Sequence, residues 1–108
     1  DGLVMGIYLN ENGLRGTIPS EVGLLSTLEY LWLHGNTITS TIPTEVGMLS
    51  SLQQLWLYDN GFSGTIPTEV GKLSNLQHLL LYNNTITGSI PSEVGMLSSI
   101  TEMYLNNN

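Results

Sequence analysis

The chain has 108 residues, enough for one domain, and 41% of them are hydrophobic, which excludes an intrinsically disordered polymer. Nine acidic against two basic side chains give a formal net charge of −7, which excludes nucleic acid as a partner and direct contact with an anionic membrane surface. The chain has no cysteine, so disulfides and thiolate metal sites are excluded, and no apolar run approaches the about 20 residues of a membrane span.

An internal repeat of 24 residues dominates the sequence. It aligns columns of prolines and glutamates without a gap, as well as a column of asparagines: Asn12, Asn36, Asn60, Asn84 and Asn108. A coil of this length cannot enclose a core, so each coil must bury its apolar side against its neighbours. We predict a single array of coils over residues 4–27, 28–51, 52–75 and 76–99, with a partial coil over 100–108.

Each coil opens with a short predicted strand, marked in the second coil by Leu28, Leu31 and Leu33. Strand alternation places Leu31 and Leu33 on the core face, and the residues between and beside them on the outer face. The asparagine that follows is a turn residue whose amide can bond backbone groups of its own coil and of the next. We therefore interpret the asparagine column as a structural ladder.

An Ile-Pro-Ser/Thr-Glu-Val-Gly segment follows in every coil and predicts a short helical turn. Proline sets the starting φ, Ser or Thr can cap the turn, Glu favours its positive end and Gly ends it. Only a few residues separate the proline from the glycine, so a 3₁₀ turn is expected rather than an α-helix.

The repeat as it runs near residues 76 to 97, Leu-x-x-Leu-x-Leu-x-x-Asn-x-Ile-x-Gly-x-Ile-Pro-x-Glu-Val-Gly-x-Leu, resembles the plant-type class of leucine-rich repeat. That class occurs in receptor-kinase ectodomains, receptor-like proteins and polygalacturonase inhibitors, and similar copies occur in algal relatives. The resemblance implies an α/β fold: a right-handed curved solenoid with a parallel concave sheet, a second small sheet and 3₁₀ turns on the convex side. It further implies a non-catalytic recognition module, part of an extracellular or cell-surface protein.

The two ends of the chain depart from that family. Extracellular members carry cysteine-paired caps, whereas this chain enters its first coil at Asp1-Gly2-Leu3 and stops at Asn108. Ends without caps are expected to expose core side chains, and we expect the chain to be a fragment of a longer protein. The side chains concerned are Val4, Ile7 and Leu9 at one end and Ile100, Met103 and Leu105 at the other.

The outer face of the predicted strands gathers both tryptophans, all five tyrosines and both histidines. Folding does not require aromatic residues at solvent-facing strand positions, and Trp and Tyr are favoured in binding hot spots. We predict a site for a protein, peptide or carbohydrate, stacked on sugar rings or packed on apolar side chains. Its residues are Tyr8, Tyr30, Trp32, His34, Trp56, Tyr58, Asp59, His78, Tyr82 and Tyr104.

Two other functions remain open at this stage. Cross-strand aromatic pairs also stabilise sheets, so the array could be a structural spacer without a ligand. Regular rows of threonine resemble the surfaces of ice-binding solenoids, and the array could have that role. One such row lies outside the concave face, although a serine interrupts it: Thr17, Thr41, Thr65 and Ser89. The sequence carries no signal for an oligomeric state.

Signals for catalysis, cofactors and metals are weak. The glutamate column would lie on solvated convex turns in one shared environment, which offers no separate acid and base. His34 and His78 lie two coils apart, about 10 Å, too far to share a metal ion. No Gly-x-Ser-x-Gly elbow or phosphate loop occurs, so no enzyme and no cofactor are expected.

Asn83-Asn84-Thr85 is a formal glycosylation acceptor, expected to be unoccupied because Asn83 borders the predicted site.

Overall fold

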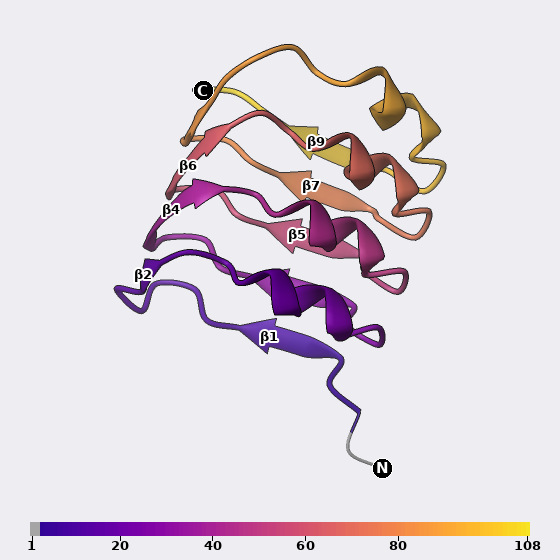
Figure 1. Ribbon diagram of the computed structural model, residues 1–108, viewed down its shortest axis with the longest axis horizontal. Helices are drawn as coiled ribbons and strands as arrows, with labels where there is room; N and C mark the ends of the chain where they lie inside the picture. The colour runs from indigo at the N-terminus through magenta and orange to yellow at the C-terminus, as the bar shows by residue number, and fades with distance from the viewer. Residues whose placement is uncertain (1–2) are drawn as a thin grey trace.

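Successive coils of the chain stack on one another in order, from the N-terminus to the C-terminus (Figure 1). The computed structural model describes residues 3–108. One strand from each coil joins a five-stranded parallel sheet, which we call the concave sheet. Its strands are β1 (Gly6–Tyr8), β3 (Tyr30–Trp32), β5 (Gln54–Trp56), β7 (His78–Leu80) and β9 (Glu102–Tyr104).

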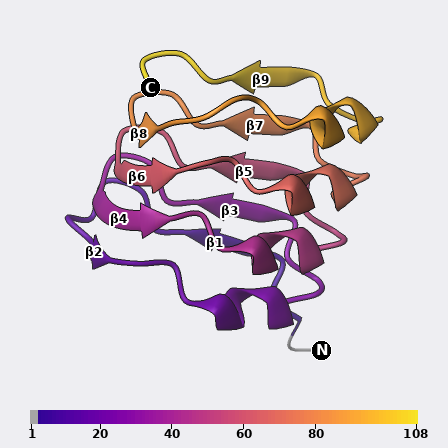
Figure 2. The same ribbon diagram turned by 45° about the horizontal axis from the view of Figure 1, so that its top comes forward.

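A second, four-stranded parallel sheet lies at the end of each coil opposite the 3₁₀ turns (Figure 2). Its strands are β2 (Arg15–Gly16), β4 (Thr37–Thr41), β6 (Gly61–Gly64) and β8 (Thr85–Ile86). Each coil is completed by a 3₁₀ turn on its convex side: η1 (Ser20–Leu24), η2 (Thr44–Met48), η3 (Thr68–Lys72) and η4 (Ser92–Met96). These elements form the predicted right-handed solenoid, in which every strand pairs only with the coils before and after it.

The strands are shorter than the leucine pattern predicts. Leu28 precedes β3 instead of belonging to it, because its amide N–H donates to the carbonyl of Leu25 at the end of the previous turn. The core faces agree with the prediction: Leu31 and Leu33 are buried, as are their equivalents in the third and fourth coils. Phe62, in β6 of the second sheet, is fully buried inside the solenoid.

The 3₁₀ turns are present, but two details of their predicted chemistry are wrong. Proline is itself the N-cap residue and no side chain caps the turn, because the following hydroxyl donates to the next glutamate, as in Ser20 Oγ to Glu21 Oε1 at 3.2 Å. The glycine lies inside the turn and does not end it. A Cβ on Gly71 would lie 2.5 Å from the carbonyl oxygen of Glu93, so glycine is required there because adjacent turns pack closely.

The asparagine column connects neighbouring coils. Asn36 Nδ2 donates to the carbonyls of Leu33 in its own coil and Leu9 in the preceding coil, at 2.9 and 3.0 Å. Its Oδ1 accepts from the backbone N–H groups of Asn12 and Leu14, both at 3.0 Å. The side chains of three further asparagines likewise donate to a carbonyl and accept from a backbone N–H of the preceding coil: Asn60, Asn84 and Asn108. These bonds satisfy turn groups that the short strands leave unpaired.

Candidate functional site: an aromatic concave surface

Strand pairing in the concave sheet aligns the outward side chains into columns. The pairs Tyr8–Trp32 and Trp32–Trp56 continue through Leu80 to Tyr104. A neighbouring column runs through Gly6, Tyr30, Gln54, His78 and Glu102. We call the outward side chains of this sheet and of the residues just after its strands the concave aromatic surface. It contains every residue that the sequence predicts for the site.

The first group of rings is centred on the two tryptophans. Trp32 and Trp56 stack with ring centroids 4.1 Å apart and an angle of 2° between their planes. Tyr8 covers one end of the pair, meeting Trp32 edge-on at 4.7 Å. His78 lies parallel to Trp56 at the other end, at 6.1 Å. Leu80 interrupts the aromatic column and is buried, so Tyr104 stands apart from the tryptophans.

A second stack runs beside the first, two residues further along each coil. His34 stacks on Tyr58 at 4.4 Å, and Tyr58 stacks on Tyr82 at 4.5 Å, with planes 16° and 9° apart. Tyr104 approaches Tyr82 edge-on at 6.3 Å. His34 is buried in this arrangement, and its Nδ1 has no hydrogen-bond partner. The histidine is therefore covered by its neighbours.

The stacking direction determines what the surface offers to a ligand. Rings stacked between adjacent strands have their faces against one another and direct their edges away from the sheet. An aromatic edge carries partial positive charge, whereas the face carries negative charge. The surface therefore presents apolar, weakly positive ring edges, together with the tyrosine hydroxyls.

Polar side chains of the column that runs from Gly6 to Glu102 lie next to the tryptophan rings. Trp32 Nε1–H donates to Gln54 Oε1 at 3.0 Å. One coil later the equivalent positions hold Trp56 and His78, and the buried Trp56 Nε1 and His78 Nδ1 lack hydrogen-bond partners. The other ring nitrogen of His78 lies 3.9 Å from a carboxylate oxygen of Glu102. The fourth and fifth coils thus hold a second set of polar groups along this column, His78 and Glu102.

A polar rim borders the aromatic rings, formed by the residue that precedes each ladder asparagine. These residues adopt a left-handed backbone: Glu11, Gly35, Asp59, Asn83 and Asn107. Asn107 Nδ2 donates to Asn83 Oδ1 at 2.8 Å, and Asn83 Nδ2 donates to Asp59 Oδ1 at 2.7 Å. Sequence analysis identified Asp59 but missed this second ladder. The clustering of Asn, Asp and Gly in one column, all tolerant of φ > 0, was the available signal.

Two side chains of the second stack, His34 and Tyr58, have pKa values that are shifted by their surroundings. Burial lowers the pKa of His34, while the nearby carboxylates of Glu11 and Asp59 act against that effect. Burial also raises the pKa of Tyr58, reinforced by the adjacent Tyr82 and by the same two carboxylates. At neutral pH His34 is therefore an uncharged ring in the stack, and the net charge of the rim is negative.

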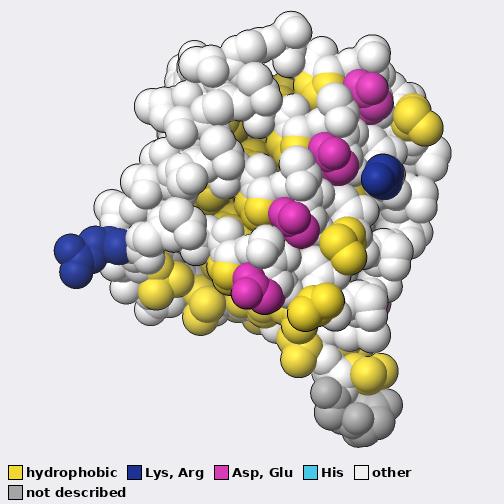
Figure 3. All heavy atoms as spheres, viewed as in Figure 1, with side chains coloured by type: hydrophobic (Ala, Val, Ile, Leu, Met, Phe, Trp, Pro, Cys, Tyr) yellow, Lys and Arg dark blue, Asp and Glu magenta, His cyan; other side chains and the backbone are white. Residues whose placement is uncertain are grey.

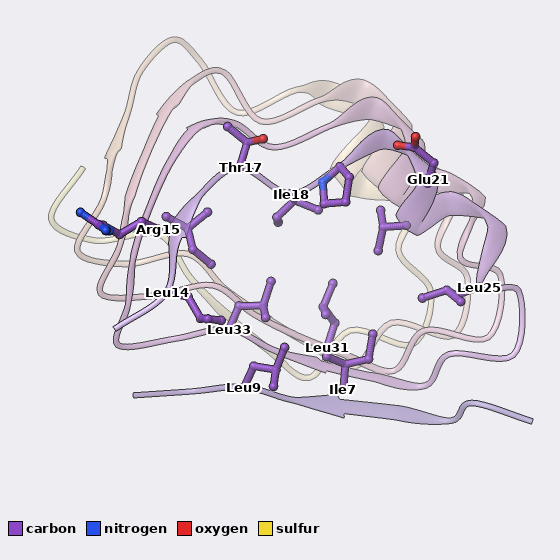
Figure 4. Close-up of a pocket in the computed structure, with 13 residues that line it drawn as sticks. Ile7, Leu9, Leu14, Arg15, Thr17, Ile18, Glu21, Leu25, Leu31 and Leu33 are labelled. Carbon is purple, nitrogen blue, oxygen red and sulfur yellow. The ribbon is translucent and has the colours of Figure 1, made fainter. Parts of the chain in front are cut away.

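A cavity of about 400 Å³ opens at the N-terminal end of the solenoid (Figure 4). Its walls include Ile7, Leu9, Leu14, Ile18 and Val22. Each of these occupies a column whose members are buried in the second and third coils, so the repeat itself accounts for the apolar lining. We therefore place the candidate site on the concave aromatic surface and not in this cavity.

Neither a metal centre nor a membrane span is visible in residues 3–108. No three His, Cys, Asp or Glu side chains in that range are grouped closely enough to hold a metal ion. None of the helical turns there has the length and apolarity needed to cross a bilayer. His34 and His78 lie in different stacks of rings.

Comparisons with solved structures agree with the observed architecture. The chain is 31% identical to a chain of the BIR3–SERK2 complex from Arabidopsis thaliana, with a TM-score of 0.93 over 98% of this chain and 57% of that chain. It is 40% identical to a chain from the plant peptide hormone receptor RGFR1 in complex with RGF2, with a TM-score of 0.93 over 94% of this chain and 16% of that one. A bacterial leucine-rich-repeat protein from Leptospira interrogans is 38% identical, with a TM-score of 0.85 over 94% of this chain and 26% of the other.

The chain thus spans little more than half of the first of these proteins and about a quarter or less of the other two. A search of curated proteins found no match. The family pattern described as a leucine-rich repeat region matches residues 8–108, which is nearly the whole chain. Together with the 24-residue register of the concave sheet, this match shows that the chain belongs to the leucine-rich-repeat family.

Proposed function

We propose that this chain is a recognition module that binds an extended peptide or a peptide-like segment of a protein on its concave aromatic surface. The observation that carries the proposal is the pair of ring stacks directed outward beside a polar rim. The related structures support it, since RGFR1 is in complex with the peptide RGF2 and PEPR1 with AtPEP1. The BIR3–SERK2 structure is a complex between proteins.

Ring geometry favours a peptide over a carbohydrate. A sugar that stacks on an aromatic ring needs an exposed face, and the faces of Trp32, Trp56 and Tyr58 are covered by neighbouring rings. Ring edges and hydroxyls instead suit contact with aliphatic side chains and with backbone carbonyls, which are drawn to the positive edge. Tyrosine and tryptophan also lose few rotamers on binding, which limits the entropic cost.

Charge narrows the class of partner further. The carboxylates of Glu11, Asp59 and Glu102 lie on or beside the concave aromatic surface. The two basic side chains of the protein lie elsewhere, Arg15 in β2 and Lys72 in η3. A neutral or basic peptide is therefore the expected ligand. We expect the parent protein to be receptor-like or secreted and to act at the cell surface. We expect this chain to bind its ligand without catalysing a reaction.

The test is a binding screen of the chain against arrayed extracellular peptides and arrayed glycans, repeated with a Trp32→Ala, Trp56→Ala variant. Two central aromatic anchors are worth about 2 kcal/mol each or more, so a bound peptide should lose at least about 700-fold in affinity. The matched control is Thr39→Ala, Thr41→Ala, which alters exposed side chains of β4 in the second sheet. Circular dichroism and thermal melting would establish that each variant remains folded.

Other results would point to different functions. A glycan ligand that depends on the tryptophans would overturn the argument from covered ring faces. Ligand binding that survives in the double variant would move the site away from the concave aromatic surface. If Trp32→Thr, Trp56→Thr preserves both stability and every function of the parent protein, the spacer interpretation is correct.

A further inference from the structure

We propose that the convex side of the solenoid is a second docking surface, which takes a basic amphipathic helix from a partner protein. Every 3₁₀ turn places a glutamate at its second position and an exposed residue three positions later. The glutamates form the convex carboxylate column: Glu21, Glu45, Glu69 and Glu93. The apolar column comprises Leu24, Met48 and Met96, which are 75%, 56% and 67% exposed. Figure 3 shows a row of acidic side chains with hydrophobic side chains on both sides of it.

The fold does not require the apolar column. Lys72 occupies the equivalent position in the third coil and is exposed there, so a charged side chain is accepted without change to the turn. The Met48 thioether lies outside the core, where a Cβ on Gly23 of the preceding coil would be 3.0 Å from its sulfur. Long apolar side chains held on the surface in register are typical of an interaction site.

A shallow hollow joins the two columns. It has a volume of about 300 Å³ between η1 and η2, and its walls include Glu21, Leu24, Glu45 and Met48. Carboxylates thus lie on the border of an apolar depression, which is the arrangement that receives an apolar side chain flanked by basic ones. Flexible methionines allow such a surface to adapt to the shape of its partner.

Charge complementarity identifies the occupant. Within residues 3–108, none of the four column carboxylates pairs with a lysine or arginine. A second copy of this acidic chain or an anionic membrane would be repelled, whereas a basic segment would be attracted. The rise of an α-helix per turn, about 5.4 Å, is somewhat larger than the about 4.8 Å between neighbouring strands, as suits the outer side of a curved stack, where coils are spaced more widely than on the concave side. A helix lying along the solenoid axis can therefore present about one apolar and one basic residue to each coil.

The experiment measures binding of a fluorescein-labelled synthetic helix of leucine and lysine, with its leucines on one face, by fluorescence anisotropy. The comparison peptide has the same composition in scrambled order. A Met48→Ser, Met96→Ser variant and a Glu45→Gln, Glu69→Gln variant should each weaken binding of the amphipathic helix at least tenfold. The charge-matched control is Glu11→Gln, Asp59→Asn on the polar rim, which should change that affinity less than twofold.

Three results would overturn the proposal: equal binding of the scrambled peptide, unchanged affinity in both convex variants, or a tenfold loss in the rim control. The first would mean attraction by net charge alone, and the third would place the helix on the concave side. All substituted side chains are on the surface, and thermal melting checks that the variants are folded. The Met48→Ser, Met96→Ser variant should retain any ligand found for the concave aromatic surface, so failure of either proposal leaves the other standing.

Discussion

The first and third coils have the same pattern of core residues but very different burial. Leu57 is fully buried, whereas Leu9, in the same column two coils earlier, is 44% exposed. Similarly, Ile66 is 7% exposed and Ile90 in the fourth coil is 58% exposed. The third coil packs between neighbours on both sides, while the first and fourth each have one side less completely covered. Burial in this protein therefore depends on adjacent coils and not on the internal composition of a coil.

Truncation of equivalent leucines should give the largest contrast between these coils. We expect Leu57→Ala to lower the free energy of unfolding by about 3 kcal/mol, since it removes buried methyl groups and leaves a cavity. Leu9→Ala should cost about 1 kcal/mol or less, because much of the side chain is already in contact with water. Urea unfolding followed by circular dichroism measures both values. Equal losses would show that the coils do not derive their stability from their neighbours.

The asparagine ladder gives the next largest effect. Asn84→Ala removes an acceptor for the N–H of Phe62 and a donor to the carbonyls of Leu57 and Leu81. We expect a loss of about 2 kcal/mol, because buried backbone groups are left unpaired. Within residues 3–108, the side chain of Asn12 bonds only the exposed carbonyl of Asn10. Asn12→Ala should therefore change the melting temperature little, and a similar drop in the two variants would contradict the ladder's role between coils.

The glycines of the 3₁₀ turns allow inner and terminal coils to be compared by the addition of a single carbon atom. A Cβ on Gly71 would lie 2.5 Å from the carbonyl oxygen of Glu93 in the next turn, whereas Gly95 has no atom within 4 Å of that position. Gly71→Ala should destabilise the protein by about 1–2 kcal/mol, since the turns must move apart. Gly95→Ala should be neutral or slightly stabilising in the same chemical denaturation assay. Destabilisation by both variants would indicate a requirement for glycine within the turn itself.

The smallest expected effect concerns His34. Because burial lowers its pKa in the folded state, the unfolded chain takes up a proton at higher pH than the folded chain. The stabilisation due to neutral His34 is therefore complete above about pH 6.5 and is lost as the pH falls below that value. Melting temperatures between pH 7.5 and 5 should decline more steeply for the native chain than for His34→Phe. Identical slopes would show that the ring titrates as it does in the unfolded chain.

Much of this architecture could be predicted from the sequence. The 24-residue period determines which residues share a column, and the alternation of leucines determines which face of each strand is buried. Both rules are local or periodic, so they predict the registers of Trp32 with Trp56 and of Tyr8 with Trp32, as the structure shows. The gathering of the aromatic residues on one sheet follows from the same two rules.

Only the tertiary structure decided how those side chains are used. The orientation of the rings in each stack, the burial of His34 and the bond from Asn83 to Asp59 all depend on rotamers chosen against residues in adjacent coils. The requirement for glycine at Gly71 likewise arises from a carbonyl in the following turn. Sequence periodicity specifies which positions become neighbours, but contact geometry between neighbours depends on packing in three dimensions. For that reason the sequence determined the aromatic surface, and the packing of its rings decided that the ring edges point away from the sheet.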